Sequence, residues 1–437
     1  MKPKLAISVV LFVSWVALNC SSNSTENTAQ PPGADLVMLE ADNPKITDIV
    51  EQVDLDSLKS TIATLVGFFT RHTNSDTLSE TEGIGAARRW VFNKFQNISQ
   101  ENGGRLKVSF HTFEATIRGV TGRHRNVVAE LPGTVTPEKK YLVSGHLDSR
   151  NRDLDDAVNF APGANDDGSG VAAVLELARI FSQFEFESTV IFVAFTGEEE
   201  GLFGSRALAR ALRQENVDIA GMVTNDIIGN IVGGSGKVDS LSVRCFSDEP
   251  TDSPSRQLAR YIKAQGEAYL PGFTVNLIPN RDRPGRGGDH FGFNEQGYPA
   301  ARLTEPEDNL QHQHNMDDLP EFMAFSYFTR VVKVNAAYLA SLADAPKIPL
   351  NVQVSVLADG QRKITWDQPQ PEKVVDYLVA FRSPGAVNYE GLISAGNVNE
   401  FLLDSNRVSS FPIYVSISAV DRAANESVFS KEVLIEP

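Results

Sequence analysis

Cysteine is nearly missing from this sequence: only Cys20 and Cys245 occur among its 437 residues. If Cys20 is acylated or removed, Cys245 has no partner in its own chain. An exported chain without disulfides must rely on its hydrophobic core, and on any metal that it binds, for stability. Cys245 lies in the apolar stretch LSVRCF, so we expect it to be a small buried hydrophobic residue.

Positive charge is also scarce. The sequence has 40 Lys and Arg residues against 56 Asp and Glu residues, which gives a net charge of −16. Nucleic acid is bound through clusters of Lys and Arg, and no large cluster occurs, so nucleic acid is excluded as a partner. The same charge repels an anionic membrane surface, so any membrane attachment needs a device other than a basic patch.

No apolar run near the start of the chain is long enough to span a bilayer. The run Leu5–Leu18 is shorter than the roughly 20 residues that a spanning helix requires. It follows two lysines and fits the apolar part of a signal peptide. Its end at Cys20 resembles a bacterial lipoprotein signal. We therefore expect a signal peptide at 1–20, a flexible tether at 21–45, and lipid on Cys20 that holds an exported protein at a membrane, facing the periplasm or cell surface; an ordinary cleaved signal and a secreted protein are the alternative.

The stretch from His146 to Gly170, HLDSRNRDLDDAVNFAPGANDDGSG, carries histidine and carboxylates where a strand gives way to a helix. The apolar run YLV precedes it, and apolar residues at helical spacing follow it. A strand that ends in a histidine and a loop that supplies a carboxylate are how an open α/β sheet builds a site. Taken alone, such residues more often form surface pairs and turns.

The same arrangement occurs after three more predicted strands. Chance does not readily explain this repetition. The strands at 188–196, 218–226 and 300–305 are followed by, or end in, these polar residues: Glu198, Glu199, Glu200, Asp226, His312, His314, Asp317 and Asp318. Histidine and carboxylate without thiolate suit Zn²⁺ or another divalent first-row metal. The alternating pattern predicts an α/β fold with a mostly parallel central sheet and helices on both faces.

At this point the sequence resembles a known family, the bacterial leucyl aminopeptidases with two co-catalytic zinc ions (peptidase family twenty-eight). The resemblance covers about residues 55–341. The motifs that carry it, in order, are GHLDS at 145–149, PGANDDGSG at 162–170, TGEEEGLFGS at 196–205, ND at 225–226, GGDHFGFNEQGYPA at 287–300 and HQHNMDD at 312–318. The resemblance implies the zinc exopeptidase fold.

It also implies a site with two Zn²⁺ ions. By this resemblance, His146 and Asp226 are ligands of one ion, and Glu199 and His314 are ligands of the other. Asp166 is the carboxylate that bridges both. Each ion would then have one neutral imidazole, one carboxylate of its own and a share of Asp166, which leaves a position open for water.

Further roles follow from the same resemblance. Glu198 is similar to the general base of the family. Asp148 matches the residue that orients His146 by accepting its second ring N–H. Asp318 matches an aspartate behind the last histidine ligand, and Glu200 is left for solvent or for the start of a helix.

The sequence changes character after Asp344. Residues 345–349 read as a linker, and the runs NVQVSVL, KITW, YLVAF and IYVSISAVD that follow are short and rich in β-branched residues. They predict a small β-sandwich that resembles a fibronectin type III domain over 347–437, behind a zinc metallopeptidase domain at 46–344. We expect an independent module without catalytic residues, acting as a spacer or as a contact to carbohydrate or protein.

The resemblance favours an exported aminopeptidase that removes N-terminal residues from peptides. A carboxypeptidase or dipeptidase and a glutaminyl cyclase on the same scaffold are alternatives, and so is a non-catalytic binding protein. A cyclase is disfavoured because only Trp90 of the three tryptophans lies in the catalytic region, and loss of catalysis is disfavoured because all five ligands and the base are present. Arg281, Arg283 and Arg286 either bind a substrate carboxylate or form a solvated turn.

Overall fold

The computed structural model describes residues 43–248, 250–403 and 411–437. The predicted signal peptide, Cys20 and all of the predicted tether before residue 43 lie outside the described residues. Within the described ranges, no helix combines the length and the apolar character that crossing a membrane requires.

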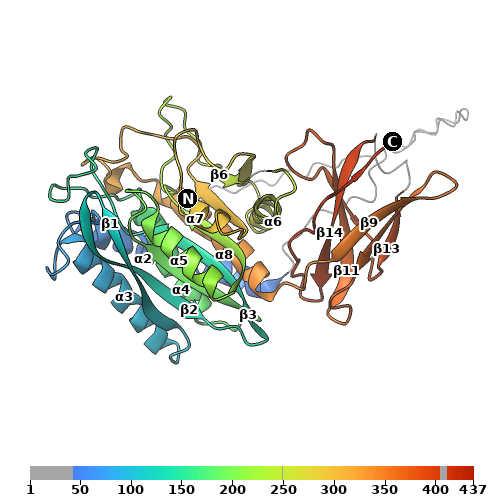
Figure 1. The fold of residues 1–437 in the computed structure, drawn as a ribbon, viewed down its shortest axis with the longest axis horizontal. Helices are drawn as coiled ribbons and strands as arrows, with labels where there is room; N and C mark the ends of the chain where they lie inside the picture. Colours follow the sequence, from blue (N-terminus) through green and yellow to red (C-terminus); the bar gives the residue numbers. More distant parts are fainter. Residues whose placement is uncertain (1–42, 249, 404–410) are drawn as a thin grey trace, which may run out of the picture. The chain divides into compact units, whose positions relative to one another are not determined.

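An eight-stranded sheet forms the centre of the region before Asp344 (Figure 1). Its strands are β1 (Lys107–Ile117), β2 (Val120–Leu131), β3 (Thr136–His146), β4 (Ser188–Phe195), β5 (Asp218–Asn225), β6 (Ser242–Ser247), β7 (Thr274–Ile278) and β8 (Ala300–Thr304). They lie in the order β1-β2-β4-β3-β5-β8-β6-β7. The pairs β3/β4, β3/β5, β5/β8 and β6/β7 are parallel, and the other three are antiparallel. The central strands therefore end at a common edge.

Helices cover both faces of this sheet. They are α1 (Pro44–Glu51), α2 (Leu55–Val66), α3 (Gly83–Glu101), α4 (Gly168–Phe181), α5 (Phe203–Gln214), α6 (Pro254–Tyr269), α7 (His290–Asn294) and α8 (Phe325–Asp344). Side chains alternate between the faces of a strand. Accordingly, Tyr141 and Val143 of β3 join the larger core with α1–α4, α6 and α8, whereas Leu142 joins a second core with α5 and α7. The predicted α/β fold is confirmed. Cys245 is fully buried in the larger core.

Two glycines let the start of α4 press against the ends of β3 and β5. A Cβ atom on Gly145 would lie 2.4 Å from the carbonyl carbon of Gly170, and one on Gly170 would lie 2.2 Å from the carbonyl oxygen of Asn225. No side chain fits at such distances. This contact brings the loop before α4 over the strand ends, where the histidine and carboxylates of the neighbouring motifs emerge.

The region after Asp344 consists of two antiparallel sheets, which confirms the predicted all-β class. One sheet contains β9 (Leu350–Val356), β10 (Arg362–Asp367) and β13 (Glu400–Leu403); the other contains β11 (Val374–Arg382), β12 (Gly391–Ser394), β14 (Ile413–Asp421) and β15 (Val433–Ile435). Trp366 of the first sheet and Tyr377 of the second belong to one hydrophobic core, with ring centroids 5.5 Å apart.

A buried polar contact, here called the α6 seam, joins this β region to α6. Arg260 of α6 lies 2.8 Å from Glu432, and Glu432 lies 2.6 Å from Arg382 of β11; all three side chains are fully buried. Val428 belongs to the core of the larger region. The β region has a core of its own, but Val428 and these buried charges also pack it against the larger region. These contacts argue against the independence that the linker composition at 345–349 predicts.

Candidate metal centre

Five motifs deliver polar side chains to the carboxyl-terminal edge of the sheet. His146 ends β3, Asp226 follows β5 directly, and the loop after β4 carries Glu198 and Glu199. The loop before α4 supplies Asp166, and the long loop after β8 supplies His314. Parallel strands that end at one edge bring these loops together, as expected for a site of an open α/β sheet.

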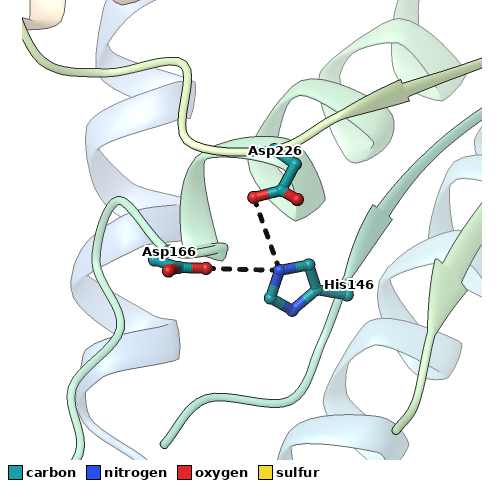
Figure 2. A group of neighbouring side chains, drawn as sticks. All are labelled: His146, Asp166 and Asp226. Carbon is teal, nitrogen blue, oxygen red and sulfur yellow. Dashed lines mark ion pairs between the residues drawn. The ribbon is translucent and has the colours of Figure 1, made fainter. Parts of the chain in front are cut away.

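His146, Asp166 and Asp226 form the first cluster (Figure 2). The Nε2 atom of His146 lies 3.3 Å from Oδ1 of Asp166 and 3.6 Å from Oδ1 of Asp226. All three side chains are almost completely buried. Figure 2 shows both carboxylates turned toward the same ring nitrogen.

Asp166, Glu199 and His314 form the second cluster. The Nε2 atom of His314 lies 2.9 Å from Oδ2 of Asp166 and 3.2 Å from Oε2 of Glu199. In each cluster the candidate ligand atoms lie within 4.8 Å of one another. Asp166 belongs to both clusters through its two oxygens, so the structure brings together all five residues named from the sequence, with Asp166 between the two groups.

The chemistry of these donors fits metal ions. The Oδ2 atom of Asp166 and the Oε1 atom of Glu199 are buried and accept no hydrogen bond from the described residues. Burial disfavours a charged imidazole at His146, but Glu198 and Asp166 outweigh it and raise the pKa of His146 well above its ordinary value. Such a cluster attracts positive charge. Imidazole and carboxylate without thiolate are ligands that suit zinc.

Two arginines to which the sequence analysis assigned no role form ion pairs with the candidate ligands. The Nε atom of Arg150 lies 2.7 Å from Oε2 of Glu199, and Nη2 of Arg302 lies 3.1 Å from Oδ2 of Asp226. Burial opposes ionisation of Asp226, but Arg302 and His146 outweigh it, so its pKa lies below the ordinary value. At Glu199, His314 and then Arg150 likewise outweigh burial and lower the pKa. Both carboxylates are therefore held in the ionised form that a metal ligand requires. No motif in the sequence marks them.

Asp148 acts on two neighbours at once. The Nδ1 atom of His146 donates to the main-chain carbonyl of Asp148 at 3.0 Å, while its carboxylate oxygen Oδ1 lies 4.0 Å away. The carboxylate instead accepts the N–H groups of Gly197 and Glu199, at 2.9 and 3.0 Å. Asp148 thus accepts the second ring N–H of His146, as expected, but through its main-chain carbonyl. Its carboxylate is occupied by two main-chain donors of the loop after β4, which need acceptors.

Glu198 belongs to neither ligand cluster. Its Oε2 atom lies 4.0 Å from Nε2 of His146, and its side chain lines the pocket beside the candidate ligands. Burial, above all, raises the pKa of Glu198 well above its usual range. Asp148 holds the main chain on both sides of Glu198.

Two further aspartates hold the loop that carries Asp166. The oxygens of Asp318 accept the N–H groups of Asn165 and Asp166, both at 2.9 Å. Asp167 accepts the main-chain N–H of His146 at 2.9 Å and caps α4 through Gly170 at 2.8 Å. The sequence analysis assigned no role to Asp167. Its place in the NDDG motif, next to the shared ligand and just before a helix, is the signal that could have found it.

Glu200 does not face solvent. Its side chain is fully buried, and Thr73 donates to Oε2 at 2.7 Å, while Nε2 of His72 lies 3.2 Å from Oε1. Burial raises the pKa of Glu200 to about 8. The expectation that Glu200 faces solvent is therefore wrong. His72 and Thr73 cover its side chain, and no local pattern reveals such a long-range contact.

A mixed α/β sheet with two adjoining clusters of histidine and carboxylate at its strand ends defines a metal-dependent hydrolase. The sequence profile of Peptidase family M28 matches residues 126–339. A probable zinc metalloprotease of Pyrenophora tritici-repentis is 35% identical over 428 residues, covering 89% of this chain and 88% of its own. One from Leptosphaeria maculans is 36% identical and covers 83% of this chain and 91% of its own. The chain belongs to peptidase family M28 and is a zinc metalloprotease homologue.

Solved structures share the fold at low identity. The Legionella pneumophila LapA aminopeptidase has a TM-score of 0.57 at 20% identity, with coverage of 72% of this chain and 78% of its own. The aminopeptidase of Aneurinibacillus sp. strain AM-1 has a TM-score of 0.54 at 15% identity, with 69% and 97% covered. A Porphyromonas gingivalis glutaminyl cyclase has a TM-score of 0.51 at 18% identity, with 65% and 97% covered.

Proposed function

We propose that this chain is an exported aminopeptidase that hydrolyses the first peptide bond of peptides, with Glu198 as general base. The observation that carries the proposal is the convergence of five candidate ligands around Asp166, with Glu198 beside them and outside both clusters. The aminopeptidases of Legionella pneumophila and Aneurinibacillus share this fold, which supports a peptide substrate.

Zinc held by His146, Asp166 and Asp226, and by Asp166, Glu199 and His314, would polarise the substrate carbonyl as a Lewis acid. Glu198 takes a proton from the attacking water and returns it to the nitrogen of the leaving amine.

We propose two ions for each chain, because Asp166 offers one oxygen to each cluster. Elemental analysis of the purified protein tests this number. One tightly bound ion, or activity that survives a strong chelator, would contradict it.

The competing functions differ in which end of the substrate must be free. A carboxypeptidase requires a free C-terminus, and a glutaminyl cyclase releases ammonia from N-terminal glutamine. The pocket contains one aromatic side chain among its lining residues, Phe291. We place an aminopeptidase ahead of a cyclase because a cyclising pocket needs aromatic walls around the glutamine.

The decisive experiment is a substrate profile of the full chain. Amino-acid p-nitroanilides and free dipeptides should be cleaved, while the same compounds with blocked N-termini should not. Cleavage that persists with a blocked N-terminus but needs a free C-terminus would instead indicate a carboxypeptidase, and ammonia release from N-terminal glutamine a cyclase.

We further propose that residues 347–437 are a fibronectin type III-like domain that contacts carbohydrate or protein. The match to the Pyrenophora relative covers 89% of this chain, more than the 346 residues before this region could supply. That relative therefore keeps at least part of the β region. Binding of the full chain to a glycan array would support a carbohydrate contact, and no binding would leave the spacer role.

Lipid on Cys20 is a separate proposal, which rests on the apolar run before it and the polar segment after it. Mass spectrometry of the mature N-terminus tests it. Cys20→Ser should release the protein into the soluble fraction or block its processing, and a free N-terminus at another residue would refute lipidation.

A further inference from the structure

The pocket beside the candidate ligands is unusual in its charges. A cavity of about 350 Å³ is lined by three carboxylates of the clusters, by the carboxylate of Glu198 and by four arginines. The arginines are Arg150, Arg206, Arg286 and Arg302. Each zinc ion that binds adds two positive charges, so the loaded pocket carries a net positive charge and favours an anionic group on the substrate.

Two of these arginines already serve the candidate ligands. Arg150 pairs with Glu199 at 2.7 Å. Arg302 is almost fully buried and pairs with Asp226 at 3.1 Å and with Asp282 at 2.9 Å. A substrate group could engage either arginine only by competing with a candidate metal ligand.

Arg206 and Arg286, the remaining two arginines of the pocket, differ in their partners. Arg206 makes a two-point contact with Glu295, at 3.0 and 2.8 Å. Arg286 has no carboxylate partner among the described residues, and its one polar contact is a long hydrogen bond from Nη2 to the amide oxygen of Gln313, at 3.3 Å. Its side chain is half-buried in the pocket wall. The guanidinium can therefore accept a new anionic partner without losing an existing one.

The two nearby arginines of the same loop are committed elsewhere. Arg283 pairs with Asp282 at 3.0 Å and with Asp308 at 2.7 Å. Arg281 lies over the ring of Phe291, with its guanidinium 3.9 Å from the ring centre. Neither lines the pocket. Among the three arginines at 281–286, these contacts leave Arg286 as the candidate for binding an anionic group of the substrate.

We propose that Arg286 is a specificity-determining residue that binds a carboxylate of the peptide substrate; this proposal rests on the proposed function. Its planar guanidinium can donate two parallel hydrogen bonds to a carboxylate. Leu202 and Phe291 line the same pocket and supply an apolar wall. A substrate with an apolar side chain and a carboxylate nearby fits this combination.

The carboxylate can come from two sources. It is either the free C-terminus of a short peptide or an acidic side chain close to the scissile bond. Two substrate pairs separate them: Leu-Ala against its C-terminal amide, and Leu-Glu-amide against Leu-Gln-amide. In each pair the apolar first residue is the same, and only the charge changes.

The test is the ratio of kcat/KM within each pair, measured for the full zinc-loaded chain. At least one pair should favour the carboxylate about 10-fold or more, and Arg286→Gln should reduce that ratio roughly 10- to 100-fold, toward unity, as expected for loss of a hydrogen-bonded charge. Arg210→Gln is the matched control, because Arg210 is exposed and outside the pocket. Arg286→Lys should keep part of the preference. Titration of the same compounds into Glu198→Gln gives the preference as binding, without turnover.

Ratios near unity in both pairs for the wild-type chain would overturn the proposal, as would an unchanged ratio in Arg286→Gln. These outcomes differ from failure of the proposed function. If only substrates with a blocked N-terminus are cleaved, the aminopeptidase assignment falls, while the carboxylate preference is still read from blocked versions of the same pairs.

Discussion

The metal centre and the α6 seam both bury several charged side chains, yet they satisfy them differently. In the seam, Glu432 lies between Arg260 and Arg382 with contacts of 2.6 to 2.8 Å, so the acid has a cation on each side. At the metal centre, buried oxygens of Asp166 and Glu199 accept no hydrogen bond from the described residues. Arg150 and Arg302 pair with Glu199 and Asp226, yet the two buried oxygens still lack a donor. Unsatisfied buried acceptors are costly, so the seam serves stability, and the metal centre points to a bound cation and to function.

The largest expected effect comes from removing the seam entirely. A chain that ends at Ala345 loses Glu432 and leaves Arg260 and the apolar surface around Val428 without partners. We expect it to aggregate, which size-exclusion chromatography and circular dichroism would measure. A monomeric, active shortened chain would instead restore the independent module that the linker composition predicts.

At the metal centre, Glu198→Gln keeps the shape of the side chain and removes its proton acceptor. We expect turnover to fall roughly 10²- to 10⁴-fold. Zinc content, measured by elemental analysis, should be unchanged because Glu198 lies outside both clusters. Glu199→Gln, by contrast, should lower the zinc content. Equal loss of metal in both variants would mean that Glu198 is also a ligand.

In the seam, Glu432→Ala leaves two buried arginines without their shared acid. Breaking a buried ion pair costs about 3–5 kcal/mol, so the free energy of unfolding from denaturant titration should fall by that order. Glu400→Ala is a suitable control, since Glu400 pairs with Lys363 at the surface and is about half exposed. A surface pair contributes about 1 kcal/mol or less. Similar losses in both variants would show that the seam is no more important than the surface.

A second buried contact between the β region and α6, at Glu426, makes the stability of the chain depend on pH. It is buried, accepts a hydrogen bond from Gln265 of α6 at 3.1 Å, and burial raises its pKa to about 7. A raised pKa means that its contribution to stability is complete below its ordinary pKa and is lost as the pH rises through 7. The shift corresponds to about 3 kcal/mol.

Thermal unfolding between pH 5 and pH 8 tests this contribution. The wild-type chain should lose stability over this range, and Glu426→Gln should lose less because it stays neutral. The same slope in both proteins would assign the pH dependence to other groups.

The smallest effect is expected at Glu200. Because its pKa is about 8, the side chain is mostly protonated at pH 7, and glutamine resembles a protonated glutamate. Glu200→Gln should change stability and turnover by no more than about 1 kcal/mol, the contribution of one hydrogen bond. Glu200→Ala should cost more, because Thr73 and His72 lose a buried partner. If Glu200→Gln were inactive and Glu198→Gln normal, the role of base would belong to Glu200.

The sequence predicts the sheet from local patterns, and it predicts the five candidate ligands through the resemblance of its motifs to a known family. Apolar runs identify β3, β4 and β5; His146 and Asp226 lie at strand ends, whereas Asp166 and His314 lie in loops. It does not predict contacts between distant segments. Thr73 reaches Glu200 over 127 residues, and Arg260 reaches Glu432 over 172. Nothing near either residue in the sequence distinguishes a buried partner from a solvated one.

The mutual contact of Gly145, Gly170 and Asn225 also bears on how such a chain can diverge. Any side chain at either glycine meets main-chain atoms, which cannot turn away as a flexible side chain can. Neither position can therefore change alone, and a compensating change would have to move β3, β5 or α4 and, with it, His146, Asp166 or Asp226. This contact therefore ties the spacing of His146, Asp166 and Asp226 to two residues that carry no side chain.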